Sequence, residues 1–521
     1  MSCFINSDIF REYDIRGIAD RDLTAPVVEA LGRAFAEYIR PKGVSTVVVG
    51  YDARLSSPRL RDALIQGLMA SGLAVTDLGL CPTPVLYFSL HHLHIGAGVM
   101  ITGSHNPSEF NGFKLCVGKD TIYGEEIQKI RRILEEAGKK AHSSLLIAQE
   151  AQNHEPSATS HQPRATKHAI LPDYINYLKS KFQDHRDIPL KVVLDAGNGT
   201  AGLAAPEILR HMGCEVTELF SEPDGAFPNH HPDPTIPENL HVLIDTVRAQ
   251  KADAGIAFDG DADRIGVVDE QGNILWGDQL MVIFARDILT HQPGATFVSE
   301  VKCSQTMYND IRAHGGNAIM WKTGHSLIKA RMKEVGAALA GEMSGHLFFA
   351  DRYFGYDDAI YAACRLVEIL KIIKKTGKTA HGSSLMAHEG KNQEPKNISH
   401  QLRAKSQTLS SLVADLPKVY NTPEIRVDCP DTIKFKVVDK VKELLTNGYG
   451  LPLKTKEVIT VDGVRAVFDR GWGLVRASNT QPVLVMRFEA TDPVSLEAIK
   501  DLMNENLKKI LTNLKTQEDA S

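Results

Sequence analysis

A serine hydroxyl stands in a short loop, residues 102–107, with the sequence Thr-Gly-Ser-His-Asn-Pro. The apolar residues 97–101 before it predict a buried strand, Gly103 permits unusual backbone angles, and Asn106-Pro107 prevents a helix from beginning. Ser104 is therefore expected at the carboxyl end of a strand, where open α/β sheets place their ligands. The loop alone indicates either a nucleophile or an ordinary polar turn.

Three carboxylates, those of Asp259, Asp261 and Asp263, alternate directly after the apolar residues 254–258. The residues between them are small, so the loop can curl and direct all three at one centre. Oxygen ligands of this kind suit Mg²⁺, and without a cation they would repel one another and raise their pKa values. An EF-hand is excluded because Arg264 stands where that loop needs glycine. An acidic surface turn remains the alternative.

Two further loops combine polar groups that suit a sugar phosphate. Residues 341–346 (Gly-Glu-Met-Ser-Gly-His) offer a carboxylate, a hydroxyl and an imidazole for sugar hydroxyls, or form a satisfied polar loop. Residues 476–480 (Arg-Ala-Ser-Asn-Thr) lie between predicted strands and can surround a phosphate; an exposed hairpin is the alternative. Lys302 and His325 each follow a predicted strand, and residues 10–17 supply two more arginines.

The elements that must position these loops repeat along the chain. Three successive segments alternate strand, loop and helix, which predicts parallel βαβ units. After about residue 421, short strands and a closing helix indicate an α+β unit. We therefore expect an α/β protein of three similar mixed α/β domains and a C-terminal α+β domain, with these boundaries: 1–140, 169–275, 276–376 and 416–521.

Polar segments at 141–168 and 377–415 interrupt this plan. Residues 141–165 and 380–404 are identical at 14 of 25 positions with a constant offset of 239, although their flanks do not repeat. We interpret them as two copies of one inserted element, mobile or disordered, at domain junctions. A histidine-rich metal tract is the alternative, but its histidines lack regular ligand spacing.

The composition narrows the class of protein. The chain has 521 residues, and its 59 basic and 64 acidic side chains give a net charge of −5, so nothing suggests a nucleic-acid partner. The seven cysteines are scattered without a CxxC pair, which indicates reduced thiols. We see neither a signal peptide nor a membrane-spanning stretch, and we expect a cytoplasmic enzyme, as a monomer or small homo-oligomer.

Together these loops resemble the α-D-phosphohexomutase superfamily, specifically its phosphomannomutase/phosphoglucomutase branch. The resemblance runs from about Phe10 to the C-terminal helix, outside the two inserted segments, and the four loops occur in the family's order. It implies four domains around a central cleft and a reaction that interconverts hexose 1-phosphate and hexose 6-phosphate. The substrates would be mannose or glucose phosphates, and a bound hexose 1,6-bisphosphate would be the intermediate and activator.

The resemblance also implies a role for each loop. Ser104 would carry the phosphoryl group as phosphoserine, and one Mg²⁺ would be held by Ser104, Asp259, Asp261 and Asp263. Charge stabilisation and proton transfer would fall to Lys114, Arg16, Arg264 and His325. The substrate contacts would be Tyr13, Lys302, Gly324, His325, Glu342, Ser344, His346, Arg476, Ser478, Asn479 and Thr480.

Two positions depart from the family pattern. Ala262 stands where glycine is common, which asks for ordinary backbone angles there, and Gln481 replaces a small hydroxyl residue. A phosphoglucosamine mutase would share the fold and mechanism. A Mg²⁺-dependent sugar phosphatase and a non-catalytic sugar-phosphate binder are alternatives of other classes. The preferred hexose is not decided by the sequence.

Overall fold

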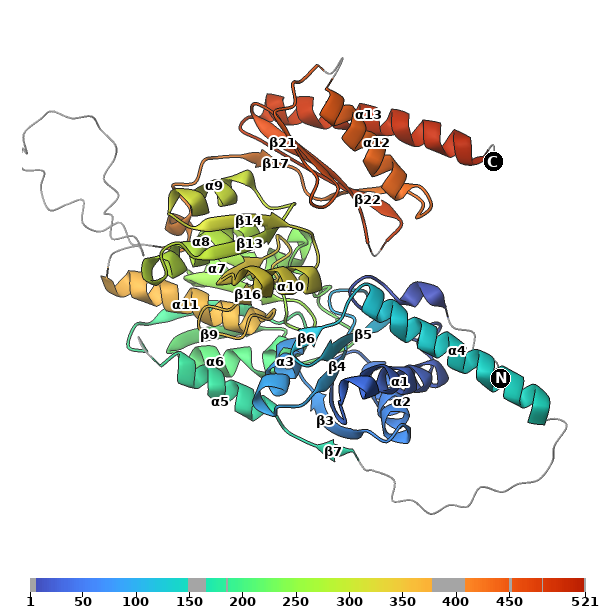
Figure 1. Cartoon of the computed structure of the whole chain (residues 1–521). Helices are drawn as coiled ribbons and strands as arrows, with labels where there is room; N and C mark the ends of the chain where they lie inside the picture. The colour runs from blue at the N-terminus through green and yellow to red at the C-terminus, as the bar shows by residue number, and fades with distance from the viewer. Residues whose placement is uncertain are drawn as a thin grey trace, which may run out of the picture.

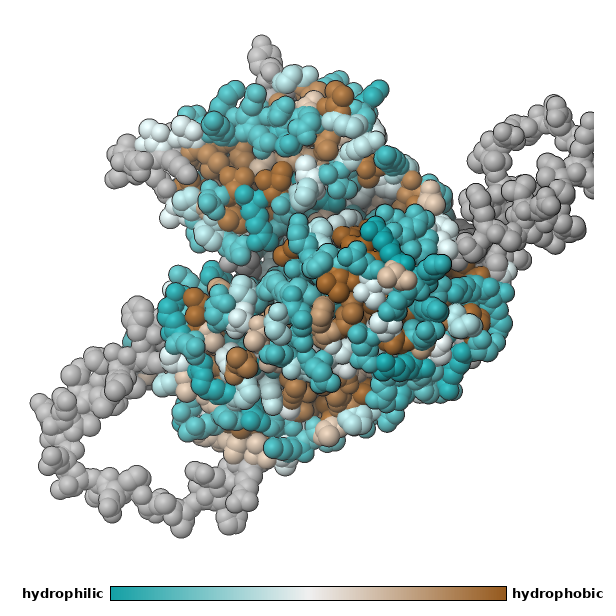
Figure 2. Space-filling view, turned by 180° about the vertical axis from the view of Figure 1, so that it is seen from behind, coloured by the Kyte–Doolittle hydropathy of each residue, from teal (hydrophilic) through white to brown (hydrophobic). Residues whose placement is uncertain are grey.

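The computed structural model describes residues 6–148, 165–183, 186–376, 408–448, 452–479 and 481–519. Four units follow one another along the chain, and the C-terminal unit stands above the third and apart from the first (Figure 1). Figure 2 shows the surface hollowed between this C-terminal unit and the first one. None of the described helices combines the length and the apolar composition needed to cross a bilayer.

The first unit is built on a sheet with strand order β1-β5-β4-β2-β3-β7, with β6 beside β5. Strands β2, β3 and β4 run parallel, whereas β5 pairs antiparallel with β4 and β1. The elements are β1 (Ile15–Ile18), α1 (Ala25–Ile39), β2 (Thr46–Tyr51), α2 (Ser57–Ala70), β3 (Ala74–Leu80), α3 (Thr83–His92), β4 (Ala97–Ile101), β5 (Phe110–Val117), β6 (Asp120–Thr121), α4 (Glu125–Ala148) and β7 (Thr166–Lys167).

The second unit repeats this design with strand order β12-β11-β10-β8-β9. Strand β8 is parallel to β9 and β10, and β11 returns antiparallel to β10. The elements are α5 (Leu171–Lys181), β8 (Leu190–Asp195), α6 (Ala205–His211), β9 (Cys214–Leu219), α7 (His241–Gln250), β10 (Ala254–Phe258), β11 (Ile265–Asp269) and β12 (Ile274–Leu275).

The third unit has strand order β14-β13-β15-β16, again with parallel strands and a final antiparallel one. Its elements are α8 (Gly277–His291), β13 (Thr296–Glu300), α9 (Gln305–Ala313), β14 (Asn317–Trp321), α10 (His325–Val335), β15 (Leu339–Gly341), β16 (Leu347–Phe349) and α11 (Ala359–Thr376).

The C-terminal unit is an antiparallel sheet of order β17-β22-β21-β20-β19, with β18 also beside β22. Helices α12 and α13 pack against it, so the expected fold class is confirmed. The elements are β17 (Tyr420–Asn421), β18 (Ile425–Asp428), α12 (Lys434–Asn447), β19 (Glu457–Ile459), β20 (Val464–Val467), β21 (Gly471–Ala477), β22 (Val483–Ala490) and α13 (Pro493–Asp519).

One position in the topology is used in every unit for a candidate loop. The loop with Ser104 (residues 102–107, here the serine loop) joins β4 to the antiparallel β5, and residues 259–264 (the acidic loop) join β10 to β11. Residues 341–346, named the sugar loop after their expected role, join β15 to β16. In the C-terminal unit residues 476–480, named the phosphate loop likewise, lie where β21 joins β22. The repeated hairpin therefore presents four different chemistries from equivalent or similar places.

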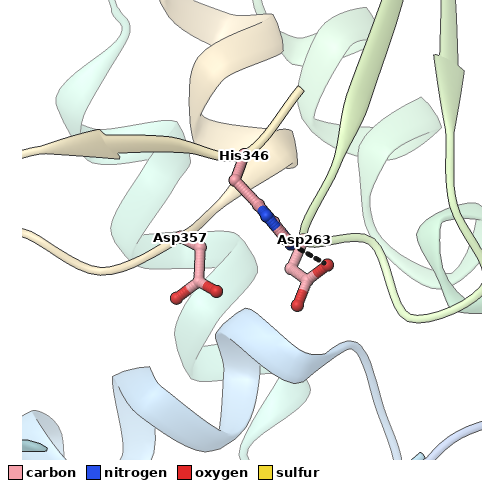
Figure 3. A group of neighbouring side chains, drawn as sticks. All are labelled: Asp263, His346 and Asp357. Carbon is pink, nitrogen blue, oxygen red and sulfur yellow. Dashed lines mark hydrogen bonds and ion pairs between the residues drawn. The ribbon is translucent and has the colours of Figure 1, made fainter. Parts of the chain in front are cut away.

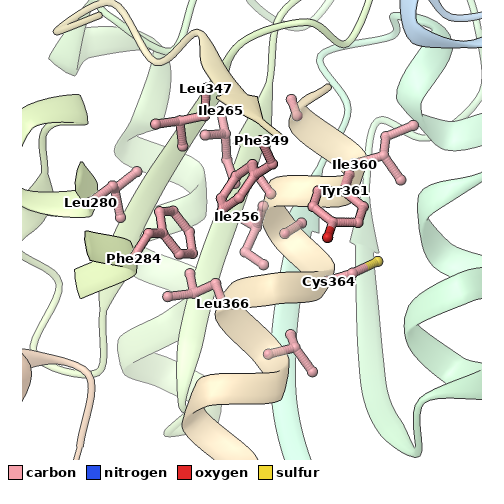
Figure 4. Close-up of a cluster of buried hydrophobic side chains, with 14 of the residues drawn as sticks. Ile256, Ile265, Leu280, Phe284, Leu347, Phe349, Ile360, Tyr361, Cys364 and Leu366 are labelled. Carbon is pink, nitrogen blue, oxygen red and sulfur yellow. The ribbon is translucent and has the colours of Figure 1, made fainter. Parts of the chain in front are cut away.

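A continuous apolar core fixes the first three units to one another. Ile256 and Ile265 of the second unit pack with Phe284, Phe349 and other side chains of the third (Figure 4), and the same cluster reaches α3 of the first unit. The C-terminal unit has its own core. A small apolar cluster of Val301, Trp472 and Leu474 joins it to the third unit. Hydrogen bonds add to this contact, such as that from Arg465 to the carbonyl of Val301 at 2.6 Å.

Parts of the two polar segments lie within the described residues. Helix α4 extends to Ala148, and β7 (Thr166–Lys167) pairs with β3. Leu409 and Leu412, near the end of the second segment, are buried in the main core. The rest of both segments, with the alternative metal tract, lies outside the described residues.

Candidate active site

Ser104 lies in the turn between β4 and β5, and it is buried. Its φ of 48° is in the left-handed region, which costs a residue with a side chain about 1–2 kcal/mol. Thr102 Oγ1 accepts the Ser104 N–H at 2.8 Å. Ser104 Oγ donates to Asp259 Oδ2 at 2.8 Å and lies 3.2 Å from His105 Nδ1. The turn thus directs the hydroxyl at the acidic loop of the next unit.

The acidic loop follows β10, and its three aspartates are wholly buried. Asp259 Oδ1 accepts the backbone N–H groups of Asp263 and Arg264, each at 3.1 Å. Lys114, on β5 of the first unit, donates to Asp261 Oδ2 at 2.7 Å and also to Asp263. The loop is therefore held jointly by its own backbone and by a cation of the neighbouring unit.

The electrostatics of this loop fit a divalent cation. Burial, followed by repulsion from Asp263 and Asp261, raises the pKa of Asp259 well above its ordinary value. Burial acts the same way on Asp263, but Lys114 and His346 outweigh it and hold that pKa well below its ordinary value. Among the described residues no donor satisfies the buried Asp261 Oδ1. The carboxylate oxygens lie within 4.8 Å of one another, and such hard donors suit Mg²⁺.

His346 lies between carboxylates from two different units. Its Nδ1 is 2.6 Å from Glu342 Oε2. Its Nε2 is 3.1 Å from Asp263 Oδ1, as Figure 3 shows. Burial and Arg264 lower the pKa of His346, but Asp263 and Glu342 outweigh them and raise it to about 9. Arg264 Nε also lies 3.2 Å from His346 Nε2, so this nitrogen faces both a guanidinium and a carboxylate. A backbone bridge between Arg264 and His346 also ties the acidic loop to the sugar loop.

His325 opens helix α10 directly after Gly324, whose φ is 130°. Its Nδ1 lies 3.6 Å from Asp357 Oδ2. Burial, followed by Lys329 and Lys114, lowers the pKa of His325 well below its ordinary value. This imidazole is therefore neutral near pH 7 and able to accept a proton.

Tyr13 joins the first, third and C-terminal units through its hydroxyl. It donates to the carbonyl of Thr323 at 2.7 Å and accepts from Asn479 Nδ2 at 2.7 Å. Arg476, on β21, donates from Nε to Asp462 Oδ2 at 2.9 Å. The phosphate loop is thus anchored beside the strand ends of the third unit.

Lys302 and Arg16 both lie in ion pairs. Lys302 Nζ is 3.0 Å from Glu424 Oε2 of the C-terminal unit, and Arg16, on β1, pairs with Asp14. Burial lowers the pKa of Lys302, but Glu300 and Glu424 outweigh it and raise that pKa above its ordinary range. Neither side chain has a hydrogen bond or ion pair to the acidic loop among the described residues.

The remaining predicted contacts lie on the sugar and phosphate loops. Ser344 is partly exposed on the sugar loop. Ser478 is buried at the end of β21, and its hydroxyl accepts the N–H of Gln481 at 3.1 Å. Thr480 lies outside the described residues.

A chain of hydrogen bonds links the serine loop to the phosphate loop. Glu342 is its centre, because it contacts His346 with one oxygen and accepts the N–H of Gly324 at 2.7 Å with the other. In order, the linked residues are Ser104, Asp259, Asp263, His346, Glu342, Gly324, Thr323, Tyr13 and Asn479. The structure therefore brings together loops of all four units.

Two buried residues of the site were not predicted. Thr83, at the start of α3, donates to Asp261 Oδ2 at 2.5 Å. Asp357 forms a second group with Asp263 and His346 (Figure 3), and Lys329 neutralises it at 2.8 Å. The only signal for Thr83 was its place after β3, and Asp357 had no motif that linked it to the histidines.

The expectation for Ala262 was wrong. Its φ is 63°, in the left-handed region that its methyl group disfavours. The position retains the conformation that suits glycine because the buried aspartates on either side are both tied to groups outside the turn. After glycine, alanine has the smallest side chain, so it strains this left-handed turn less than a larger residue would.

Comparisons with known proteins identify the family. Successive stretches match the descriptions "Phosphoglucomutase/phosphomannomutase, alpha/beta/alpha domain I" (residues 7–141), domain II (172–272) and domain III (276–388), and the family's C-terminal domain (424–506). The chain belongs to the phosphoglucomutase/phosphomannomutase family. It is therefore a phosphohexomutase, an isomerase whose substrates are hexose phosphates.

Individual relatives cover nearly the whole chain. A phosphomannomutase/phosphoglucomutase of Pseudomonas aeruginosa is 41% identical over 508 residues, 98% of this chain and 97% of the relative. A phosphoglucomutase of Neisseria gonorrhoeae is 40% identical over 497 residues, 95% and 96% of the two chains. A solved phosphoglucomutase/phosphomannomutase family structure from Burkholderia thailandensis has a TM-score of 0.79 and 37% identity, and the match covers 97% of this chain and 98% of that one.

Proposed function

We propose that this phosphohexomutase works through a phosphoserine at Ser104. Its phosphoryl group would pass to the free hydroxyl of a hexose 1- or 6-phosphate, and the resulting bound 1,6-bisphosphate would return its other phosphoryl group to the serine. The observation that carries the proposal is the 2.8 Å bond from Ser104 Oγ to Asp259 inside a buried ring of carboxylates. A phosphate carried on this hydroxyl would lie directly beside carboxylates that can bind a cation.

Mg²⁺ fits this ring, and Asp259, Asp261 and Asp263 would hold it together with a phosphoserine oxygen. The unsatisfied Asp261 Oδ1 and the raised pKa of Asp259 both support that assignment. When bound, the cation supplies charge neutralisation for the transferring phosphoryl group.

The positively charged side chains around the acidic loop would stabilise the charge of the transferring phosphoryl group. Phosphoryl transfer depends on positioning and charge stabilisation more than on covalent help from the protein. Lys114 and Arg264 pair with aspartates of the acidic loop and would stabilise charge on the transferring group, a role that Arg16 would share. His325 is neutral and would accept the proton of the attacking sugar hydroxyl.

The substrate would lie between the sugar loop and the phosphate loop. Glu342, Ser344 and His346 would bind the sugar hydroxyls, with Lys302, Gly324 and Tyr13 at the neighbouring strand ends. Arg476 can pair with both oxygens of a phosphate, and it would hold the phosphate that does not react. The other phosphate contacts on this loop would be Ser478, Asn479 and Thr480.

The sugar loop favours mannose or glucose phosphates as substrates, and a hexose 1,6-bisphosphate would activate the enzyme. The test compares turnover of mannose 1-phosphate, glucose 1-phosphate and glucosamine 1-phosphate by the wild type and by Ser104→Ala. We expect the first two to turn over faster than the third, and the variant to be inactive but folded. Faster glucosamine turnover, or steady release of inorganic phosphate, would contradict the proposal.

A further inference from the structure

Arg54 is a wholly buried arginine that the chemistry described so far does not use. It follows β2, and β2 lies parallel and adjacent to β4 in the sheet. The carboxyl ends of these two strands therefore meet at one edge. This places Arg54 directly beneath the loop that carries Ser104.

The guanidinium of Arg54 has five N–H donors, and all are used. Nε donates to Asp52 Oδ2 at 3.2 Å. The other four donors reach backbone carbonyls of the serine loop: those of Pro107 (2.5 Å), Phe110 (2.9 Å), Ser104 (2.8 Å) and Asn106. One side chain thus binds the backbone carbonyl of Ser104 and three further carbonyls between Asn106 and Phe110.

The loop needs such a partner because its backbone turns away from any regular hydrogen-bond ladder. A buried carbonyl without a donor costs about 1–3 kcal/mol, and Ser104 is also held at a φ of 48°. Gly103 permits the close approach, since a Cβ there would lie 2.4 Å from Arg54 Cζ. Asp52 completes the clamp by accepting the Gly103 N–H at 3.1 Å with the same oxygen that binds Arg54 Nε.

Lysine could not bind all of these carbonyls at once. It carries the same charge, but its donors radiate from one nitrogen and cannot reach carbonyls spread along a loop. The second unit closes over the guanidinium, where the Phe227 ring lies 5.3 Å from Arg54 Cζ. The clamp is therefore covered by a residue of the second unit, just as the acidic loop of the second unit is bound by Lys114 of the first.

We propose that Arg54 is a positioning residue for phosphoryl transfer: its guanidinium fixes the serine loop so that Ser104 Oγ faces the acidic ring. The role rests on the proposed function of Ser104 as the phosphate carrier. It predicts a defect in the rate of transfer to and from the serine, with little change in substrate binding, because no sugar- or phosphate-loop residue contacts Arg54 among the described residues.

The test uses the full-length chain as wild type, Arg54→Lys and Arg54→Ala. Ser104 phosphorylation is followed by intact mass after mixing with glucose 1,6-bisphosphate, and kcat and KM are measured for glucose 1-phosphate. A misplacement of about 1 Å costs about 100-fold in rate, so we expect Arg54→Lys to lose about 100-fold in kcat with a KM within about threefold of wild type. Guanidinium ion should restore part of the activity of Arg54→Ala, whereas sodium at equal ionic strength should not.

Arg365→Lys is the matched control, because Arg365 is equally buried and lies in ion pairs with Asp287 and Asp351, away from the serine loop. Its kcat should stay near wild type even where its stability falls. If the Arg54 variants do not fold, Phe227→Ala removes only the cover of the guanidinium from a partly exposed site, and a several-fold loss of kcat at constant KM is expected.

The outcomes separate this inference from the proposed function. If the wild type carries no phosphate on Ser104, the proposed function fails. If the wild type is phosphorylated and folded Arg54→Lys is phosphorylated at the same rate, or Phe227→Ala has wild-type kcat where only it folds, the positioning role is overturned. An equal loss of kcat in Arg365→Lys would overturn it too, by showing that general destabilisation explains the effect.

Discussion

Replacing Lys114 by methionine tests whether the negative charge of the acidic loop is neutralised jointly by Lys114 and a bound metal ion. Methionine keeps the length and the apolar stem of lysine but removes the ammonium that bonds Asp261 and Asp263. Lys114 is 4% exposed and both aspartates are wholly buried. The variant therefore leaves buried carboxylates without their cation.

The structure sets the expected size of the effect. Removing one partner from a buried ion pair costs about 3–5 kcal/mol, so we expect Lys114→Met to lose about 4 kcal/mol of unfolding free energy in EDTA. Saturating Mg²⁺ should take over the lost charge and return about 2 kcal/mol more to the variant than to the wild type, which corresponds to roughly 30-fold tighter binding. Turnover should still fall, because the transferring group loses a cation.

The assay is chemical unfolding of the full-length chain in EDTA and in Mg²⁺, for the wild type, Lys114→Met and a control, Lys371→Met. Lys371 is 1% exposed and donates to the carbonyl of Ile188 at 2.5 Å, on α11 and away from the acidic ring. Its stability loss should not depend on Mg²⁺. Equal stabilisation of Lys114→Met and the wild type by Mg²⁺ would refute the shared-charge reasoning.

Two further substitutions probe separate parts of the site, and a third probes Asp358, a buried carboxylate that accepts the hydroxyl of Tyr174 at 3.0 Å. Gly324→Ala would place a Cβ 2.4 Å from Tyr13 Cζ at a φ of 130°; we expect a loss of about 1–3 kcal/mol in stability and of about tenfold or more in kcat/KM, and wild-type values would contradict the packing. Arg476→Lys should raise KM for the sugar phosphate about 10- to 100-fold in steady-state assays, because hydrogen bonds to a charged group contribute about 1.5–3 kcal/mol. An unchanged KM would show that Arg476 does not bind the phosphate. Burial raises the pKa of Asp358 from 3.8 to about 6, so the folded state holds a proton that the unfolded state releases, and wild-type stability should fall as pH rises from about 4 to 6. Relative to Asp358→Asn, the unfolding free energy of the wild type should fall by about 3 kcal/mol across that range, measured by chemical unfolding at each pH. The same pH dependence in both proteins would show that Asp358 does not bind this proton.

The sequence predicted those parts of the site that a strand end carries directly. Ser104 and the three aspartates each follow a predicted apolar strand, and parallel strands present their carboxyl ends at one edge. The hairpins β4–β5 and β10–β11 have these residues at that place. The short strand β15 before the sugar loop was not predicted. The alternation of strands and helices in the first three units, and its end near residue 421, also gave the fold class.

What the sequence could not predict depends on contacts between distant segments. Asp357 and Thr83 lie in the site only because separate units pack together. The bridge from Tyr13 to Asn479 spans 466 positions, and no local pattern specifies it. Ala262 was misjudged for a related reason, since tertiary bonds to its neighbours override the local preference of its own side chain.

The most direct test of the account is to locate phosphate on the protein. Intact-mass measurement followed by peptide mapping should find one phosphoryl group on Ser104 after incubation with hexose 1,6-bisphosphate, and it should be lost on incubation with excess hexose monophosphate. Ser104→Ala should carry none. Phosphate on another residue, or a wild-type enzyme that turns over substrate without ever carrying phosphate on Ser104, would contradict the central claim.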